Sequence, residues 1–526
     1  MTGFTQSFYW EKIKITPSEK TSFLKNFNEN KYQVFSLDLD KLKAQLEGVP
    51  SRNNISSSSL AEIYFPDNNG GMERFQVSET STLAPEIALK YPNIKTYIGF
   101  SLDNPGARIR FSITPQGLKT MSTYPDKPTL FTVPLNKGNL SQYITYDRNV
   151  RIDSKKDFEC LTENEYVPIK EITSFNIDAN DQILRTLRIA ISTTGEYTNF
   201  WDDGDNTNGD AQEDALAAVV STLNRINEVF EVDMAVTFQL VSGIEIIYPT
   251  ASTDPYSSNL NNQLQSTLTS EVGESNYDIG HLFNYDGNNG NAGCIGCVCS
   301  TGKGRGYTTS TTPVGDNFDI DFVAHEIGHQ FGAPHTFNGN SGNCAGNRTA
   351  SNAYEPGSGS TIMAYAGICA PNVQSFSDDY FHGYNLQEIS NEILSNGHQC
   401  EVITALNNTP PVINSTSGNI VVPISTPFIL TAHASDVDGD VLSYLWEQMD
   451  NEATTQPPVA TATGGPNFRS FDPSLDSNRY FPNLSSLASN GPFTWEVLPS
   501  VARVMDFRLT VKDNHAVGTC NDFIDL

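Results

Sequence analysis

Residues 325–335 read HEIGHQFGAPH, and three histidines in this run have the types and spacing of metal ligands. His325 and His329 are four residues apart, so on a helix both imidazoles project from one face, about one turn apart. That separation suits two nitrogens bound to one zinc ion. Gly332 can take a positive φ and end the helix, so the chain turns back and brings His335 to a third position. Three histidines and a water molecule make an open, catalytic zinc site rather than a closed structural one.

Glu326 lies between two of these histidines but points elsewhere, so its carboxylate can reach a water molecule on the metal. The alternative is that the histidines are surface or packing residues of an ordinary helix. With only 8 histidines in 526 residues, this spacing seldom arises by chance. The apolar positions that predict the helix carrying the motif are Ile320, Phe322, Val323, Ile327 and Phe331.

A second motif, STIMAYAGIC, places Met363 downstream of His335 in a turn-rich stretch that begins EPGSGS. The pattern HExxHxxGxxH followed by a methionine in a tight turn resembles the metzincin clan of zinc endopeptidases. The longer runs HEIGHQFGAPHTF and EPGSGSTIMAYAGIC, with Cys344 between them, are most similar to the reprolysin-like (adamalysin-like) bacterial branch. The HTF continuation also resembles pappalysins. The resemblance covers residues 187–400 strongly and the flanking residues more weakly.

The resemblance implies that the three histidines bind Zn²⁺, that Glu326 is the general base towards a zinc-activated water, and that Met363 forms the hydrophobic floor beneath the metal. Tyr365 departs from the animal adamalysin pattern and matches the tyrosine of astacin-like and serralysin-like members. In those members it is similar to a fifth ligand that swings out to hydrogen-bond the tetrahedral intermediate. The alternative is a tyrosine that lines the wall of the specificity pocket.

The secondary-structure elements that must position these residues fall into three segments that differ in their residue patterns. Short strands with turn punctuation, such as 108–114 and 129–134, predict a β-rich N-terminal segment, with one helix near 18–47. From Leu187 a buried strand, a long amphipathic helix through Leu216 to Phe230, and the strands AVTFQLV and IEIIYP predict a layered α/β unit. After Cys400 a turn-rich linker leads to alternating strands, including NIVVPIS, typical of a β-sandwich.

The predicted fold class is therefore a multidomain α+β protein. It has a β-rich N-terminal prosegment, a metzincin-type catalytic domain with a twisted mixed sheet and helices, and a C-terminal β-sandwich. The predicted boundaries are a prosegment at 1–160, a linker or activation region at 161–186, a zinc metalloprotease domain at 187–402, and an immunoglobulin-like or PKD-like sandwich at 410–526.

Six of the eight cysteines fall between Cys294 and Cys400, which favours disulfides and an oxidising compartment over scattered thiols. CxxCxC in isolation is also a metal-site pattern. The family resemblance implies three pairs, Cys299–Cys400, Cys344–Cys369 and Cys294–Cys297.

Cys160 stands alone just ahead of the enzyme-like segment, in DFECLTE. A thiolate there could take the fourth zinc position and displace the catalytic water, which is the cysteine-switch logic of some metzincin prosegments. The surrounding residues do not match known switch motifs, and the alternative is a small buried hydrophobic residue. Either way, a folded block before a protease module predicts a latent precursor.

Asp436, Asp438 and Asp440 surround Gly439 in SDVDGDVLSY and predict a calcium loop. The loop lacks the downstream glutamate and the full spacing of an EF-hand. The alternative is an ordinary turn.

The formal net charge of −29 argues against nucleic acid or an anionic membrane as a partner. The apolar runs are too short to span a bilayer, and the start, MTGFTQSFYWEK, has no apolar region of a signal peptide. We expect a secreted enzyme acting on protein or peptide substrates, which pair along a sheet edge. We expect the sandwich to bind a surface ligand or polysaccharide. The competing hypothesis is a catalytically silent, zinc-containing surface adhesin. The intact Glu326 argues against it, because a protein that only binds needs no general base.

Overall fold

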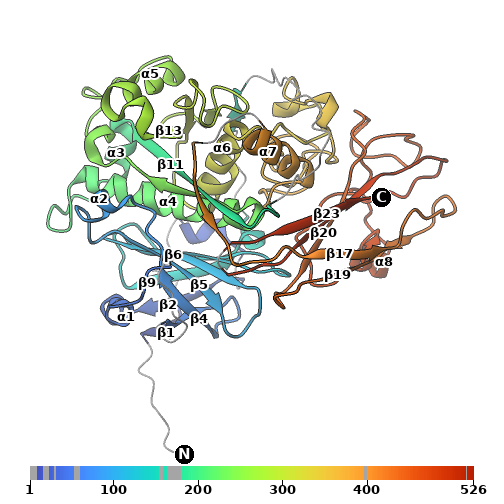
Figure 1. Cartoon of the computed structure of the whole chain (residues 1–526), viewed down its shortest axis with the longest axis horizontal. Helices are drawn as coiled ribbons and strands as arrows, with labels where there is room; N and C mark the ends of the chain where they lie inside the picture. The colour runs from blue at the N-terminus through green and yellow to red at the C-terminus, as the bar shows by residue number, and fades with distance from the viewer. Residues whose placement is uncertain are drawn as a thin grey trace, which may run out of the picture. The chain divides into compact units, whose positions relative to one another are not determined.

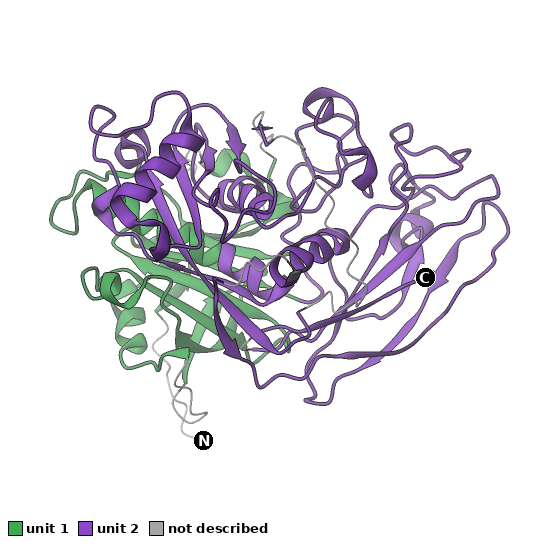
Figure 2. Cartoon of the chain, turned by 45° about the horizontal axis from the view of Figure 1, so that its top comes forward, with its two compact units in different colours: residues 1–124, 128–153, 201–225 green, residues 125–127, 154–200, 226–526 purple. Residues whose placement is uncertain are grey.

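A computed structural model describes residues 9–15, 23–28, 31–52, 60–152, 158–162, 179–395, 400–516 and 518–526. Most of the expected activation region, 161–186, lies outside these residues. The chain forms two compact units (Figure 2). Unit 1 comprises 1–124, 128–153 and 201–225, and unit 2 comprises 125–127, 154–200 and 226–526.

Unit 1 is built on a nine-stranded antiparallel sheet in the order β1-β2-β9-β8-β7-β6-β5-β4-β3. The two predicted strands are confirmed as β6 and β8. In chain order the strands are β1 (Trp10–Lys12), β2 (Gln33–Leu37), β3 (Ala61–Pro66), β4 (Met72–Glu79), β5 (Lys95–Ser101), β6 (Arg108–Thr114), β7 (Gly117–Thr123), β8 (Leu130–Pro134) and β9 (Gln142–Asp147).

The helix predicted near 18–47 is much shorter than expected. Of the described residues in this range, only α1 (Leu39–Leu46) is α-helical, and Asp38 caps it by accepting a hydrogen bond from the Lys41 N–H. QVFSL before it forms β2, because alternate residues of this run, Phe35 and Leu37, enter the core of the sheet. The short turn Phe23–Asn26 is a 3-10 helix.

The strands of unit 1 also carry buried polar side chains that meet the first half of helix α4 (Ala211–Met234). Ser112 Oγ lies 3.0 Å from Ser221 Oγ, and Gln116 Nε2 donates to the Asp214 carbonyl at 2.9 Å. Residues 201–225 therefore share unit 1 with the N-terminal sheet, whereas the end of α4 belongs to unit 2.

Unit 2 contains a mixed seven-stranded sheet in the order β10-β14-β15-β13-β11-β12, with β16 pairing to β11. Two of its paired strands, β11 and β13, are labelled in Figure 1. The strands β11, β12, β13 and β15 pair in parallel, while the β14–β15 and β11–β16 pairs are antiparallel. The strands are β10 (Glu159–Cys160), β11 (Ile183–Thr193), β12 (Val236–Leu240), β13 (Ile279–Asn284), β14 (Asn289–Asn291), β15 (Gly306–Thr309) and β16 (Val402–Ala405).

The helices around this sheet include the long one predicted through Leu216, which is α4. IEIIYP is not a strand but a 3-10 turn, Ile244–Ile246, whose last carbonyl accepts a hydrogen bond from Ser192 Oγ instead of a sheet partner. The other helices are α3 (Gly195–Trp201), α5 (Leu260–Thr267), α6 (His325–Gln330) and α7 (Gly383–Ser395), with a π-helix at Asn317–Ala324 directly before α6.

Residues 406–526, the C-terminal module, form three small antiparallel sheets around an aromatic and aliphatic core. NIVVPIS is not a strand: Val421 is fully exposed, and Pro423 has no N–H to donate to a ladder. The strands are β17 (Val412–Thr416), β18 (Phe428–Leu430), β19 (Ala432–Ser435), β20 (Ser443–Gln448), β21 (Arg479–Phe481), β22 (Phe507–Lys512) and β23 (Asn521–Asp525), and the helix is α8 (Leu484–Ser489). Among the described residues, no helix is both long and apolar enough to cross a membrane.

Candidate metal centre

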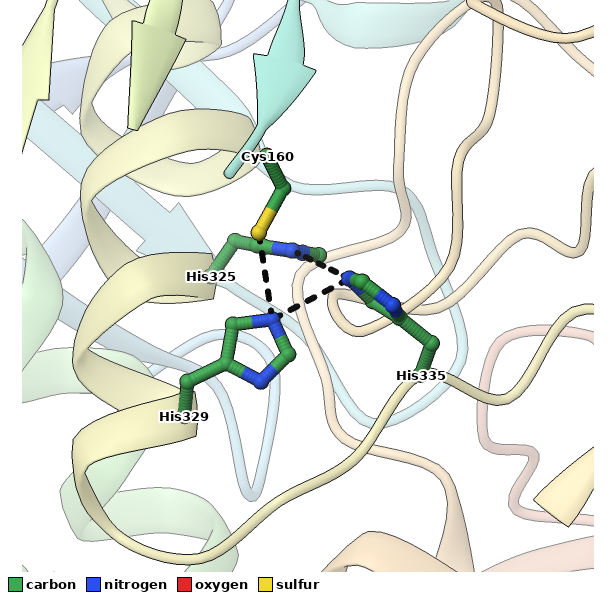
Figure 3. A group of neighbouring side chains, drawn as sticks. All are labelled: Cys160, His325, His329 and His335. Atoms are coloured by element: carbon green, nitrogen blue, oxygen red, sulfur yellow. Dashed lines mark hydrogen bonds between the residues drawn. The ribbon is translucent and has the colours of Figure 1, made fainter. Parts of the chain in front are cut away.

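The three predicted histidines turn their Nε2 atoms towards one point in unit 2 (Figure 3). His329 Nε2 lies 3.1 Å from His335 Nε2, which lies 3.3 Å from His325 Nε2. All three side chains are buried, with 0–1% of their surface exposed. Three ring nitrogens this close need a cation between them, or protons shared among them.

Each imidazole is held through its other nitrogen by a backbone carbonyl. His325 Nδ1 bonds to Ile362 O at 2.7 Å, His329 Nδ1 to Ala333 O at 2.7 Å, and His335 Nδ1 to Asn347 O at 3.0 Å. A carbonyl can only accept, so Nδ1 carries the proton and each Nε2 keeps its lone pair. Burial lowers the pKa of His329 to about 4 and that of His335 well below its ordinary value. Three neutral imidazoles with converging lone pairs are a donor set that fits Zn²⁺.

The local fold supplies this geometry as the spacing predicts. His325 and His329 project from α6, and the helix ends at Gln330 before Gly332, whose φ is +96°. Gly332 also faces Glu392 of α7, which lies beside α6 in Figure 1. The chain then reverses and presents His335.

Met363 lies beneath the turn of α6 that carries the two helical histidines. It is fully buried, and a Cβ atom added at Gly328 would come within 2.6 Å of Met363 Sδ. Gly328 therefore lets the methionine approach the helix backbone between His325 and His329.

Cys160 completes the group around the three histidines. Its Sγ lies 3.5 Å from His329 Nε2, and the four residues form one potential metal-binding cluster (Figure 3). Burial, with the Glu326 carboxylate adding to it, raises the pKa of the Cys160 thiol well above its ordinary value. The side chain arrives on β10, which pairs in parallel with β14.

Glu326 is fully buried beside the histidines. Thr162 Oγ1 donates to its Oε2 at 3.0 Å, and burial raises the Glu326 pKa to about 8. The Thr162 hydroxyl is itself fixed by the Ala292 N–H, which donates to it at 2.8 Å. A Cβ atom at Gly290 would collide with the Glu326 carboxylate, so the absence of a side chain there gives it room.

Tyr365 lies at the same centre, with its ring centroid 4.8 Å from that of His335 and 5.8 Å from that of His325. It is 1% exposed, and burial raises its pKa well above the ordinary value, with Cys160 and Glu326 adding to the shift. This position is compatible with both roles considered for the tyrosine, a metal ligand and a residue of the specificity-pocket wall.

Three residues at the centre escaped the sequence analysis. Thr162 contacts the predicted base, and Phe158 stacks on Phe322 with ring centroids 4.0 Å apart. Glu355 is buried and accepts hydrogen bonds from Thr336 Oγ1 at 2.6 Å and from the Ser360 N–H at 2.7 Å. It thereby joins the segment after His335 to the segment before Met363. The only signal for it was its place at the start of EPGSGS.

The disulfide pairing implied by the resemblance is confirmed. The sulfur atoms of three pairs lie at bonding distance: Cys294–Cys297, Cys299–Cys400 and Cys344–Cys369. His281 lies on β13 and contacts Gln330 Oε1 at 3.1 Å and Thr308 Oγ1 at 2.9 Å.

Of the predicted calcium residues, Asp436 and Asp440 lie together with Asp513, which the sequence analysis did not include. Asp438 lies outside that group, and its Oδ2 accepts a hydrogen bond from the Thr409 N–H at 2.6 Å.

Part of the chain matches one family model. Residues 183–392 match the model of the family described as "Metallo-peptidase family M12B Reprolysin-like". No curated protein matches the chain. A solved structure titled "Structure of a chaperone-substrate complex" aligns at 11% identity over 52% of this chain and 40% of that chain, with a TM-score of 0.21. This chain thus spans less than half of that protein, and a likeness so slight carries no argument. The family match, which includes all three histidines and Glu326, supports a reprolysin-like metallopeptidase domain over residues 183–392.

Proposed function

We propose that the protein is a secreted zinc endopeptidase made as a latent precursor. The observation that carries the proposal is the convergence of three Nε2 atoms, each on an imidazole fixed by a backbone carbonyl, next to the buried carboxylate of Glu326. The match to a metallopeptidase family over the same residues supports it.

His325, His329 and His335 would hold Zn²⁺. When bound, zinc polarises a carbonyl and lowers the pKa of a bound water towards about 7. Glu326 is placed to take a proton at its carboxylate and to return it to the leaving amine. Met363 packs against the helical turn at Gly328, and the Tyr365 ring lies beside His325 and His335.

Latency would arise because residues 158–162 fill the centre. Cys160 Sγ lies 3.5 Å from His329 Nε2, where the thiol would compete with a catalytic water for the metal, and Thr162 covers the Glu326 carboxylate. The backbone of this segment pairs with the edge strand, since the Leu161 N–H donates to Gly290 O at 2.7 Å. An extended substrate peptide would use the same edge once residues 158–162 have left it.

Secretion rests on the three disulfides, which persist in oxidising compartments. Protein or peptide substrates follow from the family match.

The experiment compares the parent chain with Glu326→Ala and Glu326→Gln on a gel with casein, with and without a zinc chelator. Bound zinc is measured in each sample. We expect the parent to process itself and degrade casein, and both variants to keep zinc while losing activity by about 10²–10⁴-fold, the usual contribution of a general base. If the parent binds zinc but still does not cleave casein after the predicted prosegment, 1–160, has been removed by proteolysis, the proposed peptidase activity is excluded. A folded parent without zinc would exclude the metal centre.

A further inference from the structure

We infer that a Ca²⁺ site lies where the linker enters the C-terminal module, bounded by Asp436, Asp440, Asp513 and Asn408. The site does not depend on the proposed peptidase activity. It also differs from the loop site predicted from the sequence, because Asp438 is replaced by two residues from distant parts of the chain.

The three carboxylates meet at the base of the SDVDGD turn. Single oxygens of Asp436, Asp440 and Asp513 all lie within 4.8 Å of one another. Asp436 Oδ1 shapes the turn by accepting the N–H groups of Asp438, Gly439 and Asp440 at 2.8, 2.9 and 3.1 Å. The second oxygens, Asp436 Oδ2 and Asp440 Oδ2, are buried and have no hydrogen-bond donor among the described residues. A cation bound between the two carboxylates would offset the cost of burying these oxygens without donors.

Asn408 gives an independent indication of the same ligand. Its side chain is 1% exposed, and its Nδ2 donates to Asp513 Oδ2 at 2.8 Å and to Gly518 O at 2.9 Å. This leaves the amide oxygen, Asn408 Oδ1, buried and with no donor in the part of the chain that the structure describes. A cation beside Asp513 could take this oxygen as a further ligand.

The charge balance points the same way. Asp513 is fully buried, and among the described residues its carboxylate accepts hydrogen bonds from neutral donors, the N–H groups of His515 and Cys520 and the amide of Asn408. Asp440 faces His515 and the carboxylates of Asp436 and Asp438, and burial is the main cause that raises its pKa. Lys512, the nearest ammonium along the chain, instead pairs with Asp233.

The donor set favours calcium over magnesium. Ca²⁺ takes six to eight oxygen ligands in irregular geometry, including carboxylates and amide carbonyls, whereas Mg²⁺ demands a near-ideal octahedron and keeps its waters. Three carboxylates and one amide oxygen from three separate segments match the first description.

The position of the site gives the cation a structural task. Asn408 follows β16, which pairs with β11 of the central sheet, and Leu406 packs on Leu184 and Ala235. The Thr409 N–H is bonded to the same turn through Asp438. Bound calcium would join the linker, the turn and the end of β22, and so hold the C-terminal module to the rest of unit 2.

The test uses the full chain, stripped of free cations, and measures ⁴⁵Ca²⁺ binding by equilibrium dialysis and the thermal midpoint with and without 1 mM Ca²⁺. The variants are Asp440→Asn, which removes a ligand charge, and Asp438→Asn, a matched control in the same turn whose amide oxygen can still accept from Thr409. The other acidic group, Asp202, Asp203 and Asp214, is intact in every sample.

We expect Asp440→Asn to lose one bound Ca²⁺ per chain, or to bind it at least 10-fold more weakly, and to lose the calcium-dependent rise in midpoint. Asp438→Asn should bind like the parent. A folded Asp440→Asn variant, shown by an unchanged circular-dichroism spectrum, that still binds like the parent would overturn the site. If Asp440→Asn does not fold, Asn408→Ala is used in its place, because it keeps all charges and should weaken Ca²⁺ binding. Equal loss in Asp438→Asn, or equally tight binding of Mg²⁺, would overturn the assignment.

Discussion

Thr162 Oγ1 donates a 3.0 Å hydrogen bond to Glu326 Oε2, so one threonine hydroxyl covers the carboxylate proposed as general base. Two residues earlier, Cys160 occupies the histidine side of the same centre. The two contacts cover different groups: the thiol faces the histidines, and the hydroxyl faces the glutamate. The proposed latency would therefore rest on two side chains of one short segment rather than on the cysteine alone.

Removing the Cys160 contact and removing the Thr162 contact should each speed self-processing, but to different degrees. We expect Cys160→Ser to speed self-processing most, because serine is a far weaker zinc ligand than a thiolate. Thr162→Val removes one hydrogen bond to a charged group, worth about 1.5–3 kcal/mol, so it should speed processing by roughly 10–100-fold at most. Time courses on gels measure both rates.

Leu161→Ala is the control for this pair, since the Leu161 side chain is 40% exposed and its strand pairing is made by the backbone. A Thr162→Val rate equal to that of Leu161→Ala would show that the hydroxyl has no part in latency.

Gly328→Ala should disturb the floor of the centre. The new Cβ would lie 2.6 Å from Met363 Sδ and 2.9 Å from Phe381 Cε1, both too close for an unshifted core. Overpacking of this kind costs about 1–3 kcal/mol and would displace the turn between His325 and His329. We expect a lower thermal midpoint and weaker zinc binding, measured by competition with a chromogenic chelator. Gly287→Ala, where the nearest atom is 3.6 Å away, should leave both unchanged.

Lys512→Met should destabilise unit 2 strongly. Lys512 forms a buried ion pair with Asp233 at the end of α4, and the two side chains are only 3% and 2% exposed. Removing the ammonium leaves Asp233 buried without its cation, which typically costs about 3–5 kcal/mol. The double variant Asp233→Leu/Lys512→Met should recover most of the loss in a urea unfolding curve. Failure of the double variant to recover would mean that Lys512 acts through packing rather than charge.

Without calcium, the chain should become less stable between pH 4 and pH 7. Burial raises the pKa of Asp513 from 3.8 to about 7, so the native state binds this proton more tightly than the unfolded state. For a raised carboxyl pKa, the contribution to stability is fully present below about 4 and is lost as pH rises through about 7, by at most 1.4 kcal/mol per unit.

Thermal midpoints at pH 5 and pH 8 test this prediction, with Asp513→Asn as the comparison, since the amide does not titrate. The groups facing Asp513 are Asn408, Asp440 and the N–H groups of His515 and Cys520, and all remain in the variant. The parent should lose more stability than the variant across this range, and added Ca²⁺ should narrow the difference. An equal change of the thermal midpoint in the parent and in Asp513→Asn between pH 5 and pH 8 would contradict the prediction.

The sequence by itself determined what depends on neighbours along the chain. The four-residue spacing of His325 and His329 and the positive φ at Gly332 are local requirements of one helix and its end, so they could be predicted. The long helix α4 and the strands β6, β8 and β11 followed from periodicity for the same reason. The disulfide pairs came from the family resemblance, because spacing alone leaves many pairings open.

Periodicity was misleading where a short apolar run had two possible uses. IEIIYP and NIVVPIS carry strand-forming residues, but neither forms a strand. One folds into a 3-10 turn followed by a single bridge from Ile247 to Thr193, and the other stays on the surface. Which edge is open is a property of the assembled sheet, not of the run.

Only the tertiary structure decided which distant residues meet. Cys160 and Thr162 reach the histidine helix because β10 pairs with β14, and Asp513 and Asn408 replace Asp438 because β22 and the linker end at the same turn. Such contacts join residues up to 169 positions apart, and their side chains carry no spacing pattern that a single sequence displays. They form because the sheets bring those backbone ends together, and that depends on the packing of the whole unit.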